Sequence, residues 1–174
     1  MFSRSNIALI GMPGSGKSTI GVLLAKTLCM RFVDTDILIQ NREGMSLIDI
    51  IRVKGTDYFS KAEETVIRDL HTEKTVIATG GSVVLLPEAM IRLRESSRIV
   101  YLEADLWKIR KRLWNFHTRG IVSEPGKTIE DLYRERLPLY RRYADIKIRL
   151  RGKKASQIVD EIVEKIFEEN DSGD

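Results

Sequence analysis

The chain has 174 residues, 43% of them hydrophobic, and a net charge of +4; such a chain is expected to form one globular domain over residues 1–174 with a core of its own. No apolar run approaches the ~20 residues that cross a bilayer, and the first residues carry no apolar signal region, so no membrane association is expected. The single cysteine excludes an internal disulfide and fits a cytoplasmic protein.

The first elements enclose a phosphate-binding motif. An apolar run over residues 7–10 predicts a buried strand, and apolar residues at helical spacing over 18–28 predict a helix. Between them, residues 11–18 read Gly-Met-Pro-Gly-Ser-Gly-Lys-Ser and match G-x-x-x-x-G-K-[ST]. Backbone amides of such a loop converge on an anion, and the helix N-terminus adds partial positive charge. The motif therefore predicts a site for a nucleoside triphosphate.

Two residues of this loop have expected roles. Lys17 is expected to reach the β- and γ-phosphates, and the Ser18 hydroxyl to ligate Mg²⁺. The residues expected to contact the nucleotide are Gly11, Pro13, Gly14, Ser15, Gly16, Lys17, Ser18 and Thr19. The alternative, a glycine-rich turn that binds nothing, is disfavoured because all fixed positions are present between a strand and a helix.

The next strand, over residues 31–33, runs into two acids, Asp34 and Asp36. One acid near Mg²⁺ and the other near an acceptor hydroxyl would serve phosphoryl transfer. Alternatively, both are N-caps of a helix that begins near Ile37. Helices are expected over 47–53, where Ser46 is a candidate cap, and over 58–70.

Three further strands complete a predicted sheet. Residues 75–78, 98–102 and 146–150 read as strands, and helical segments separate them. Five strands interleaved with helices predict a parallel sheet covered on both faces. Ligands bind at the carboxyl ends of such strands. The phosphate loop, the two acids and the segment 79–82, with Gly80 and Gly81, are all expected there.

The last third contains a break in periodicity and many basic residues. Residues 118–127, which include Arg119, interrupt two helices and are interpreted as a lid that excludes water, or else as a surface loop. Lysine and arginine crowd residues 108–151. Nucleic-acid binding, a solvated helix face, or anionic substrates of a phosphotransferase would each explain them. No aromatic ladder accompanies the charges, so no nucleic-acid partner is expected.

Together these motifs resemble the shikimate kinases over nearly the whole chain, whereas a GTPase is disfavoured because Asn-Lys-x-Asp is absent. The matching elements are residues 11–21, Asp34-Thr35-Asp36, Phe59 with Glu63, Gly80-Gly81, Tyr101-Leu102, Arg119 and Arg136-x-Pro138-Leu139-Tyr140. The resemblance implies a three-layer α/β fold of the nucleoside-monophosphate-kinase type. It has a five-stranded parallel sheet flanked by helices, a lid at about 115–128, and an acceptor-binding region at about 34–63.

The resemblance also implies roles for site residues and the cofactors ATP and Mg²⁺. Asp34 would hold the metal through water, and Asp36 would bind the acceptor hydroxyl as the base. The Gly80-Gly81 backbone would meet ring hydroxyls, and Arg136 would grip the substrate carboxylate. Two arginines are placed at the nucleotide: Arg119 would span nucleotide and transferred phosphoryl group, and Arg112 would stack on adenine. The expected catalytic residues are Lys17, Asp36 and Arg119.

The sequence departs from the family in the acceptor half. Ser60 stands where the family has an arginine that clamps the shikimate carboxylate, and serine cannot make a bidentate charged bond. The glycine triplet becomes Thr79-Gly80-Gly81. Phosphorylation of shikimate by a monomeric enzyme is expected. The alternatives are a kinase of a sugar acid or cyclitol, and a nucleotide-binding regulatory module without catalysis.

Overall fold

A five-stranded parallel sheet forms the centre of the molecule. The computed structural model describes residues 4–113, 121, 123 and 126–171. The strands are β1 (Asn6–Ile10), β2 (Arg31–Asp34), β3 (Thr75–Ala78), β4 (Ser97–Glu103) and β5 (Ile146–Arg149). Their order is β2-β3-β1-β4-β5, and all neighbours pair in parallel. The predicted fold class is confirmed.

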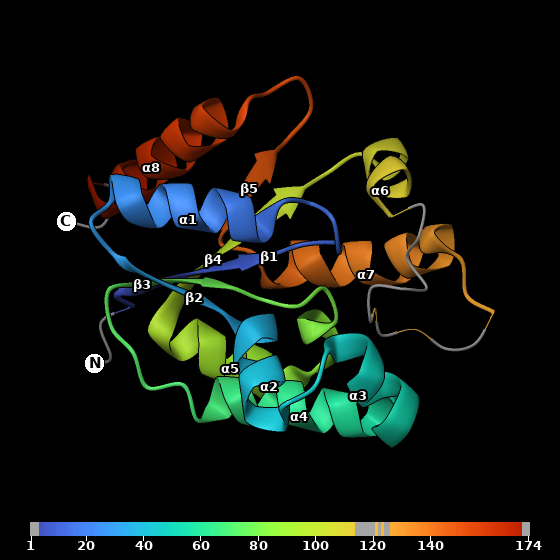
Figure 1. Cartoon of the computed structure of the whole chain (residues 1–174). Helices are drawn as coiled ribbons and strands as arrows, with labels where there is room; N and C mark the ends of the chain where they lie inside the picture. The colour runs from blue at the N-terminus through green and yellow to red at the C-terminus, as the bar shows by residue number, and fades with distance from the viewer. Residues whose placement is uncertain (1–3, 114–120, 122, 124–125, 172–174) are drawn as a thin grey trace.

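Helices cover both faces of this sheet (Figure 1). Helices α1 (Lys17–Thr27) and α8 (Ala155–Asp171) pack together on one face. On the other face, α5 (Pro87–Ser96) and α7 (Ile129–Tyr143) contact β4 and the short 3₁₀ helix η1 (Val83–Leu85). No helix in the described part of the chain is both long and apolar enough to cross a bilayer.

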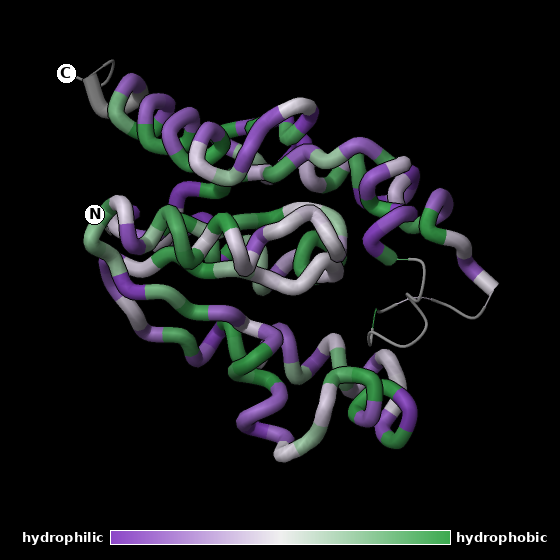
Figure 2. Tube along the Cα trace, turned by 45° about the horizontal axis from the view of Figure 1, so that its top comes forward, coloured by the Kyte–Doolittle hydropathy of each residue, from purple (hydrophilic) through white to green (hydrophobic). Residues whose placement is uncertain are grey.

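Strand position in the sheet explains the burial of each strand. The central strand β1 is buried along its full length, so its sequence is a continuous apolar run apart from Asn6. The edge strand β5 alternates, with Ile146 and Ile148 buried and the residues between them exposed. Figure 2 shows apolar residues concentrated along the central strands and alternating with hydrophilic ones along α8.

A separate helical lobe connects β2 to β3 on one side of the sheet. It contains α2 (Thr35–Glu43), α3 (Leu47–Lys54) and α4 (Thr56–Arg68), which contact one another. These helices have an apolar cluster of their own, composed of Ile39, Ile50, Phe59 and Val66. The lobe coincides with the acceptor-binding region predicted at about 34–63.

The structure differs from the predicted elements at the carboxyl end of β2. The sequence left open whether the two acids lie in a loop or cap a helix, and α2 begins at Thr35, directly after β2. Helix α6 (Leu106–Arg112) follows β4. Most of the predicted lid at 115–128, with Arg119, lies outside the described residues.

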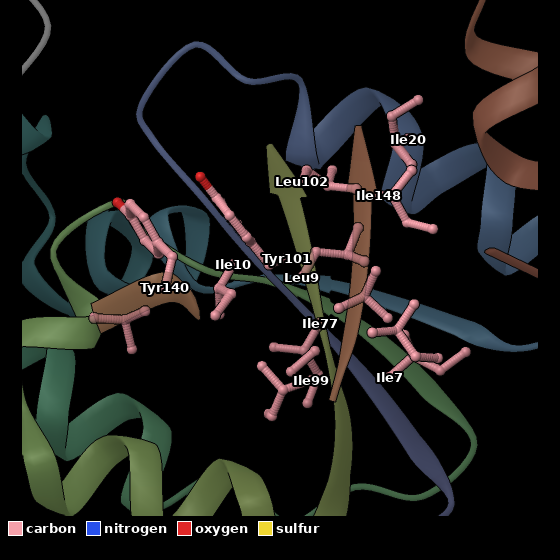
Figure 3. Packing of buried hydrophobic residues seen from close by; sticks show 14 of the residues in the cluster. Ile7, Leu9, Ile10, Ile20, Ile77, Ile99, Tyr101, Leu102, Tyr140 and Ile148 are labelled. Carbon is pink, nitrogen blue, oxygen red and sulfur yellow. The ribbon is translucent and has the colours of Figure 1, made fainter. Parts of the chain in front are cut away.

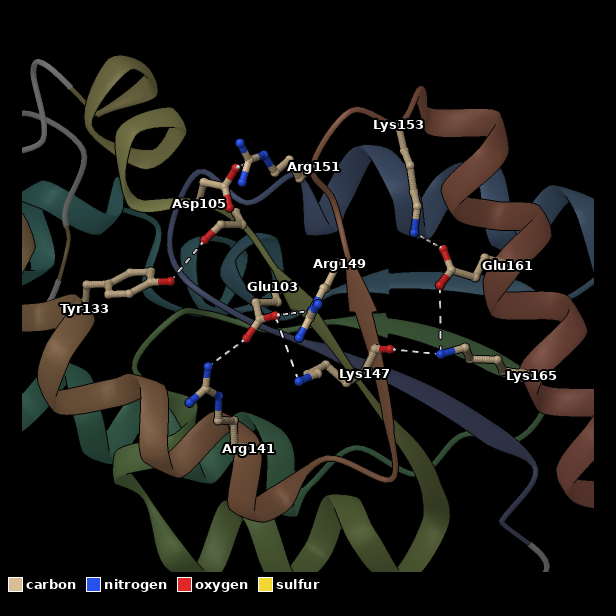
Figure 4. A network of polar contacts seen from close by, with 11 residues as sticks. Glu103, Asp105, Tyr133, Arg141, Lys147, Arg149, Arg151, Lys153, Glu161 and Lys165 are labelled. Carbon is tan, nitrogen blue, oxygen red and sulfur yellow. Dashed lines mark hydrogen bonds and ion pairs between the residues drawn. The ribbon is translucent and has the colours of Figure 1, made fainter.

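Many of the crowded basic residues are paired with acids (Figure 4). The Glu103 carboxylate lies 3.1 Å from Arg141, 3.3 Å from Arg149 and 4.0 Å from Lys147. These cations come from α7 and β5, so the carboxylate at the end of β4 links both elements. Each ion pair at an exposed surface contributes little stability. These pairs nevertheless give several of the basic residues in 108–151 a partner within the protein, so a nucleic acid is not needed to explain them.

Candidate active site

The phosphate loop connects β1 to α1 at the carboxyl edge of the sheet. Its glycines adopt backbone conformations that other residues avoid: φ is +77° at Gly14 and +99° at Gly16, the N-cap of α1. The Ser15 hydroxyl is buried and has no hydrogen-bond partner among the described residues; buried polar groups normally have a partner, which a bound phosphate would supply. The loop therefore fits the phosphates that its sequence predicts.

Lys17 is buried within this loop. Its ammonium group donates hydrogen bonds to the carbonyls of Gly11 (2.8 Å) and Met12 (2.9 Å). Burial lowers the pKa of Lys17 to about 8, although Asp36 and Asp34 raise it. The cation is thus held at the loop at an energetic cost that a bound anion would relieve.

Ser18 and Asp34 form a pair of oxygen ligands beside the loop. The Ser18 hydroxyl donates to Asp34 Oδ2 at 2.6 Å, and Asp34 Oδ1 accepts from the backbone amide of Asp36 at 3.0 Å. Asp34 is therefore the N-cap of α2 and also a neighbour of Ser18, and its role at the metal stays a prediction. A hydroxyl and a carboxylate are hard oxygen ligands that suit Mg²⁺ with bound waters.

Asp36 lies in the first turn of α2 and does not cap it. Its side chain faces a cavity of about 270 Å³ that Lys17 also lines. Burial, with a smaller contribution from the Asp34 charge, raises the pKa of Asp36 to about 6 against the opposing effect of Lys17. A carboxylate with this pKa can accept a proton near neutral pH.

The same cavity contains the acceptor residues expected from the sequence. Gly80 and Gly81 follow β3, and Arg136 enters from α7 with only 1% of its surface exposed. A cavity of this size suits a small metabolite better than a large one. Sequence reasoning did not assign a role to several other lining residues, which are Leu47, Phe59, Ser82, Leu113 and Ile121.

A buried carboxylate supports the floor of this cavity. Glu63 of α4 is fully buried, and its Oε2 accepts a hydrogen bond from Ser82 (2.7 Å). Within the described part of the chain its Oε1 has no hydrogen-bond partner, and a Cβ on Gly80 would collide with that atom. Burial raises the pKa of Glu63 to about 7. The sequence matched Glu63 to a motif, but its burial beneath Gly80 was not foreseen.

A second hollow lies on the other side of the phosphate loop. Its volume is about 530 Å³, and Gly14, Gly16 and Thr19 line both this hollow and the acceptor cavity. Arg112, predicted to stack on adenine, lines it and donates a hydrogen bond to the Gly14 carbonyl (2.7 Å). The loop thus separates two hollows, each large enough for part of a two-substrate complex.

One predicted site residue, Ser60, is not brought into these hollows, and a second, Arg119, belongs to the part of the chain that the structure does not describe. Ser60 is half-buried on α4 and does not line the acceptor cavity. It lies three residues before Glu63, so both are on one face of the helix. The roles predicted for Ser60 and Arg119 stay predictions.

Comparison with known proteins gives a consistent result. Residues 13–167 match the family model described as shikimate kinase. A shikimate kinase of a Sulfurihydrogenibium species is 40% identical over 162 residues, 92% of this chain and 97% of that protein. A shikimate kinase of Dehalococcoides mccartyi is 38% identical over 98% of each chain.

Solved structures agree with these sequence matches. Shikimate kinase from Acinetobacter baumannii in complex with shikimate has a TM-score of 0.87 at 28% identity, with 95% of this chain and 94% of that chain covered. Shikimate kinase from Aquifex aeolicus has a TM-score of 0.83 at 35% identity, with 97% and 99% covered.

Proposed function

The chain belongs to the shikimate kinase family, and we propose that it transfers the γ-phosphoryl group of ATP to the 3-hydroxyl of shikimate. One observation carries this proposal: a single phosphate loop separates two hollows, and Lys17 and Asp36 line the acceptor hollow beside it. The arrangement would hold two substrates with their reacting groups at the loop. Positioning of this kind is a large part of catalysis in phosphoryl transfer.

The phosphate loop and Lys17 would bind the nucleotide phosphates, and Arg112 would lie against adenine in the larger hollow. Ser18 and Asp34 would hold Mg²⁺, which neutralises charge on the phosphate oxygens when bound. Without substrates, the Lys17 ammonium bonds to loop carbonyls. We expect it to turn to the phosphates when ATP binds, because charged oxygens are stronger acceptors than carbonyls.

Asp36 would accept the proton of the acceptor hydroxyl as that oxygen bonds to the γ-phosphorus. The bond from the γ-phosphorus to the bridging oxygen breaks, and ADP leaves. The buried Arg136 guanidinium would bind the acceptor carboxylate through charge-assisted hydrogen bonds. The backbone of Gly80 and Gly81 would meet the ring hydroxyls.

A different small acceptor is the second candidate, and Ser60 is the observation that favours it. Among the described residues, Arg136 is the one arginine that lines the acceptor cavity. A neutral acceptor such as a cyclitol would explain Ser60, because it has no carboxylate for a second arginine to bind, whereas a sugar acid would still use Arg136. The nucleotide half of the site would serve either acceptor equally.

The first test is ADP release by the purified protein with MgATP, with and without shikimate, against a panel of sugar acids and cyclitols. Shikimate-dependent ADP release is expected, with little release in its absence. Release that depends only on another acceptor would retain the kinase and replace the substrate. Absence of release with every acceptor, despite nucleotide binding, would favour a regulatory module.

Introducing the missing arginine tests the acceptor pocket itself. Ser60→Arg is expected to lower the KM for shikimate by about 10- to 100-fold, which is the range for one charge-assisted contact with a carboxylate. The new guanidinium would also lie on the same helical face as the unpartnered Oε1 of Glu63, which would help to hold it in place. KM and kcat for shikimate are the measurements.

Ser60→Met is the matched control, because it adds a long side chain without charge. A similar KM decrease in both variants would mean that filled space, and not the guanidinium, improves binding. An unchanged or higher KM in Ser60→Arg would indicate that the pocket is adapted to an acceptor other than shikimate.

A further inference from the structure

Tyr140 is a fully buried residue of α7 next to the acceptor cavity, and the proposed function assigns it no task. Its ring stacks on Tyr101 of β4, with ring centroids 5.2 Å apart and planes at 14° (Figure 3). Its hydroxyl donates a hydrogen bond of 2.6 Å to the carbonyl of Gly81. Burial raises the pKa of Tyr140, so the hydroxyl stays protonated and donates at any pH at which the protein functions.

Gly81 is confined from the opposite side by the phosphate loop. A Cβ added to Gly81 would collide with the ring of Pro13. The backbone of Gly81 is therefore packed between Pro13 of the phosphate loop and Tyr140 of α7. Because Gly81 lines the acceptor cavity, its position fixes the distance between the acceptor and the phosphate loop.

Helix α7 contributes two side chains to this region. Arg136 and Tyr140 are four residues apart, and therefore lie on one face of the helix. Arg136 lines the cavity, while Tyr140 holds the backbone of its wall and also interacts with the Arg136 side chain. A shift of the segment 79–82 relative to α7 would therefore misplace the acceptor between Arg136 and Asp36.

We propose that Tyr140 is a positioning residue for phosphoryl transfer: its hydroxyl holds the Gly81 carbonyl so that the acceptor wall keeps its place against Pro13 of the phosphate loop. This inference rests on the proposed function. It assigns to Tyr140 no contact with the substrate or with the transferred group. Its effect is expected mainly on acceptor binding, because the nucleotide hollow lies on the other side of the loop.

Tyr101 offers a matched control within the same ring stack. Its hydroxyl is buried and has no hydrogen-bond partner among the described residues. Tyr101→Phe and Tyr140→Phe each remove one oxygen and preserve the stacked rings. Both variants are therefore expected to fold, and only Tyr140→Phe leaves the Gly81 carbonyl without its donor.

The test combines steady-state kinetics with hydrogen exchange. In Tyr140→Phe, the KM for shikimate is expected to rise about 5- to 30-fold, the range for loss of one buried hydrogen bond, with the KM for MgATP changed less than about twofold. Amide exchange in residues 80–86 of the substrate-free protein is expected to accelerate. Because Tyr140 also interacts with Arg136, this hydrogen-exchange readout is the one that reports on the Gly81 contact specifically. Tyr101→Phe should resemble the wild type in all three measurements.

Two results would overturn the inference. The first is equal exchange in the two variants, which would mean that the Tyr140 hydroxyl does not hold the segment. The second is an equal rise of both KM values, which would indicate general loosening. Failure of the wild type to phosphorylate shikimate would instead contradict the proposed function. The comparison of amide hydrogen exchange between the two variants needs no acceptor, so it would still decide the role of Tyr140.

Discussion

Asp36→Asn is expected to lower kcat about 10²- to 10⁴-fold, the range for loss of a general base. Asparagine is nearly isosteric with aspartate and can still hydrogen-bond an acceptor hydroxyl, but it cannot accept the proton. The KM for shikimate should therefore change much less than kcat. Steady-state kinetics with saturating MgATP separates the two parameters.

Asp57→Asn is the matched control, because this acid lies in the exposed first turn of α4 and its loss changes the net charge equally. It should retain kcat within about twofold, as is usual for surface substitutions remote from a site. An Asp36→Asn variant with kcat within tenfold of the wild type would exclude Asp36 as the base.

The pKa of Asp36, raised to about 6 by burial, gives this variant a pH signature. The base must be ionised, so kcat/KM of the wild type should fall as the pH drops below about 6, and Asp36→Asn should lack that decline. The folded-state pKa lies above the unfolded value, so protonation favours the folded state. The stability associated with Asp36 is therefore lost as the pH rises through about 6.

Asparagine at this position removes the charged form, and with it the cost of burial at higher pH. Asp36→Asn should consequently resist urea better than the wild type at pH 8, with a smaller difference at pH 5. Glu63, whose pKa burial and the Asp36 charge raise to about 7, titrates in both proteins. Loss of the Asp36 charge makes ionised Glu63 less costly, so it adds to the stability of the variant at pH 8. Lower stability of the variant at pH 8 would contradict burial as the cause of the raised pKa.

The phosphate loop between its strand and helix was predictable from the sequence because its determinants are local. The phosphate loop is continuous in sequence, and its function depends on backbone conformation that its glycines and the flanking strand and helix specify. The parallel sheet also followed from local patterns, and it brought Asp34, Asp36 and Gly80 to one edge. The family resemblance that these motifs indicated is confirmed.

The acceptor half was less predictable because tertiary contacts determine it. Glu63 and Glu64 are neighbours on one amphipathic helix, yet Glu63 is fully buried and Glu64 only half-buried. Helical spacing from Phe59 places Glu63 on the apolar face of α4, but it does not show what a carboxylate would contact there. Gly80 and Ser82, which are remote in sequence, provide those contacts through packing and a hydrogen bond. Similarly, the partner of Tyr140 is 59 residues away.

Lys17→Met is expected to lower kcat/KM for MgATP about 10²- to 10³-fold, as for loss of one preorganised group that stabilises developing charge. Methionine is an unbranched side chain of nearly equal length, so the change removes the charge with little change in packing. Lys26→Met, at the exposed end of the same helix α1, is the control and should retain activity within about twofold.

The stability of this variant separates a binding role from a structural one. Burial lowers the pKa of Lys17 to about 8, which means that the fold disfavours the ammonium ion despite its hydrogen bonds to Gly11 and Met12. Lys17→Met should therefore melt no lower than the wild type without ligand, yet lose most of the thermal stabilisation that MgADP gives. A lower melting temperature with MgADP stabilisation intact would make Lys17 a structural residue. An unchanged or higher melting temperature without ligand, together with weaker stabilisation by MgADP, would mean that the buried Lys17 charge serves phosphate binding and lowers the stability of the fold.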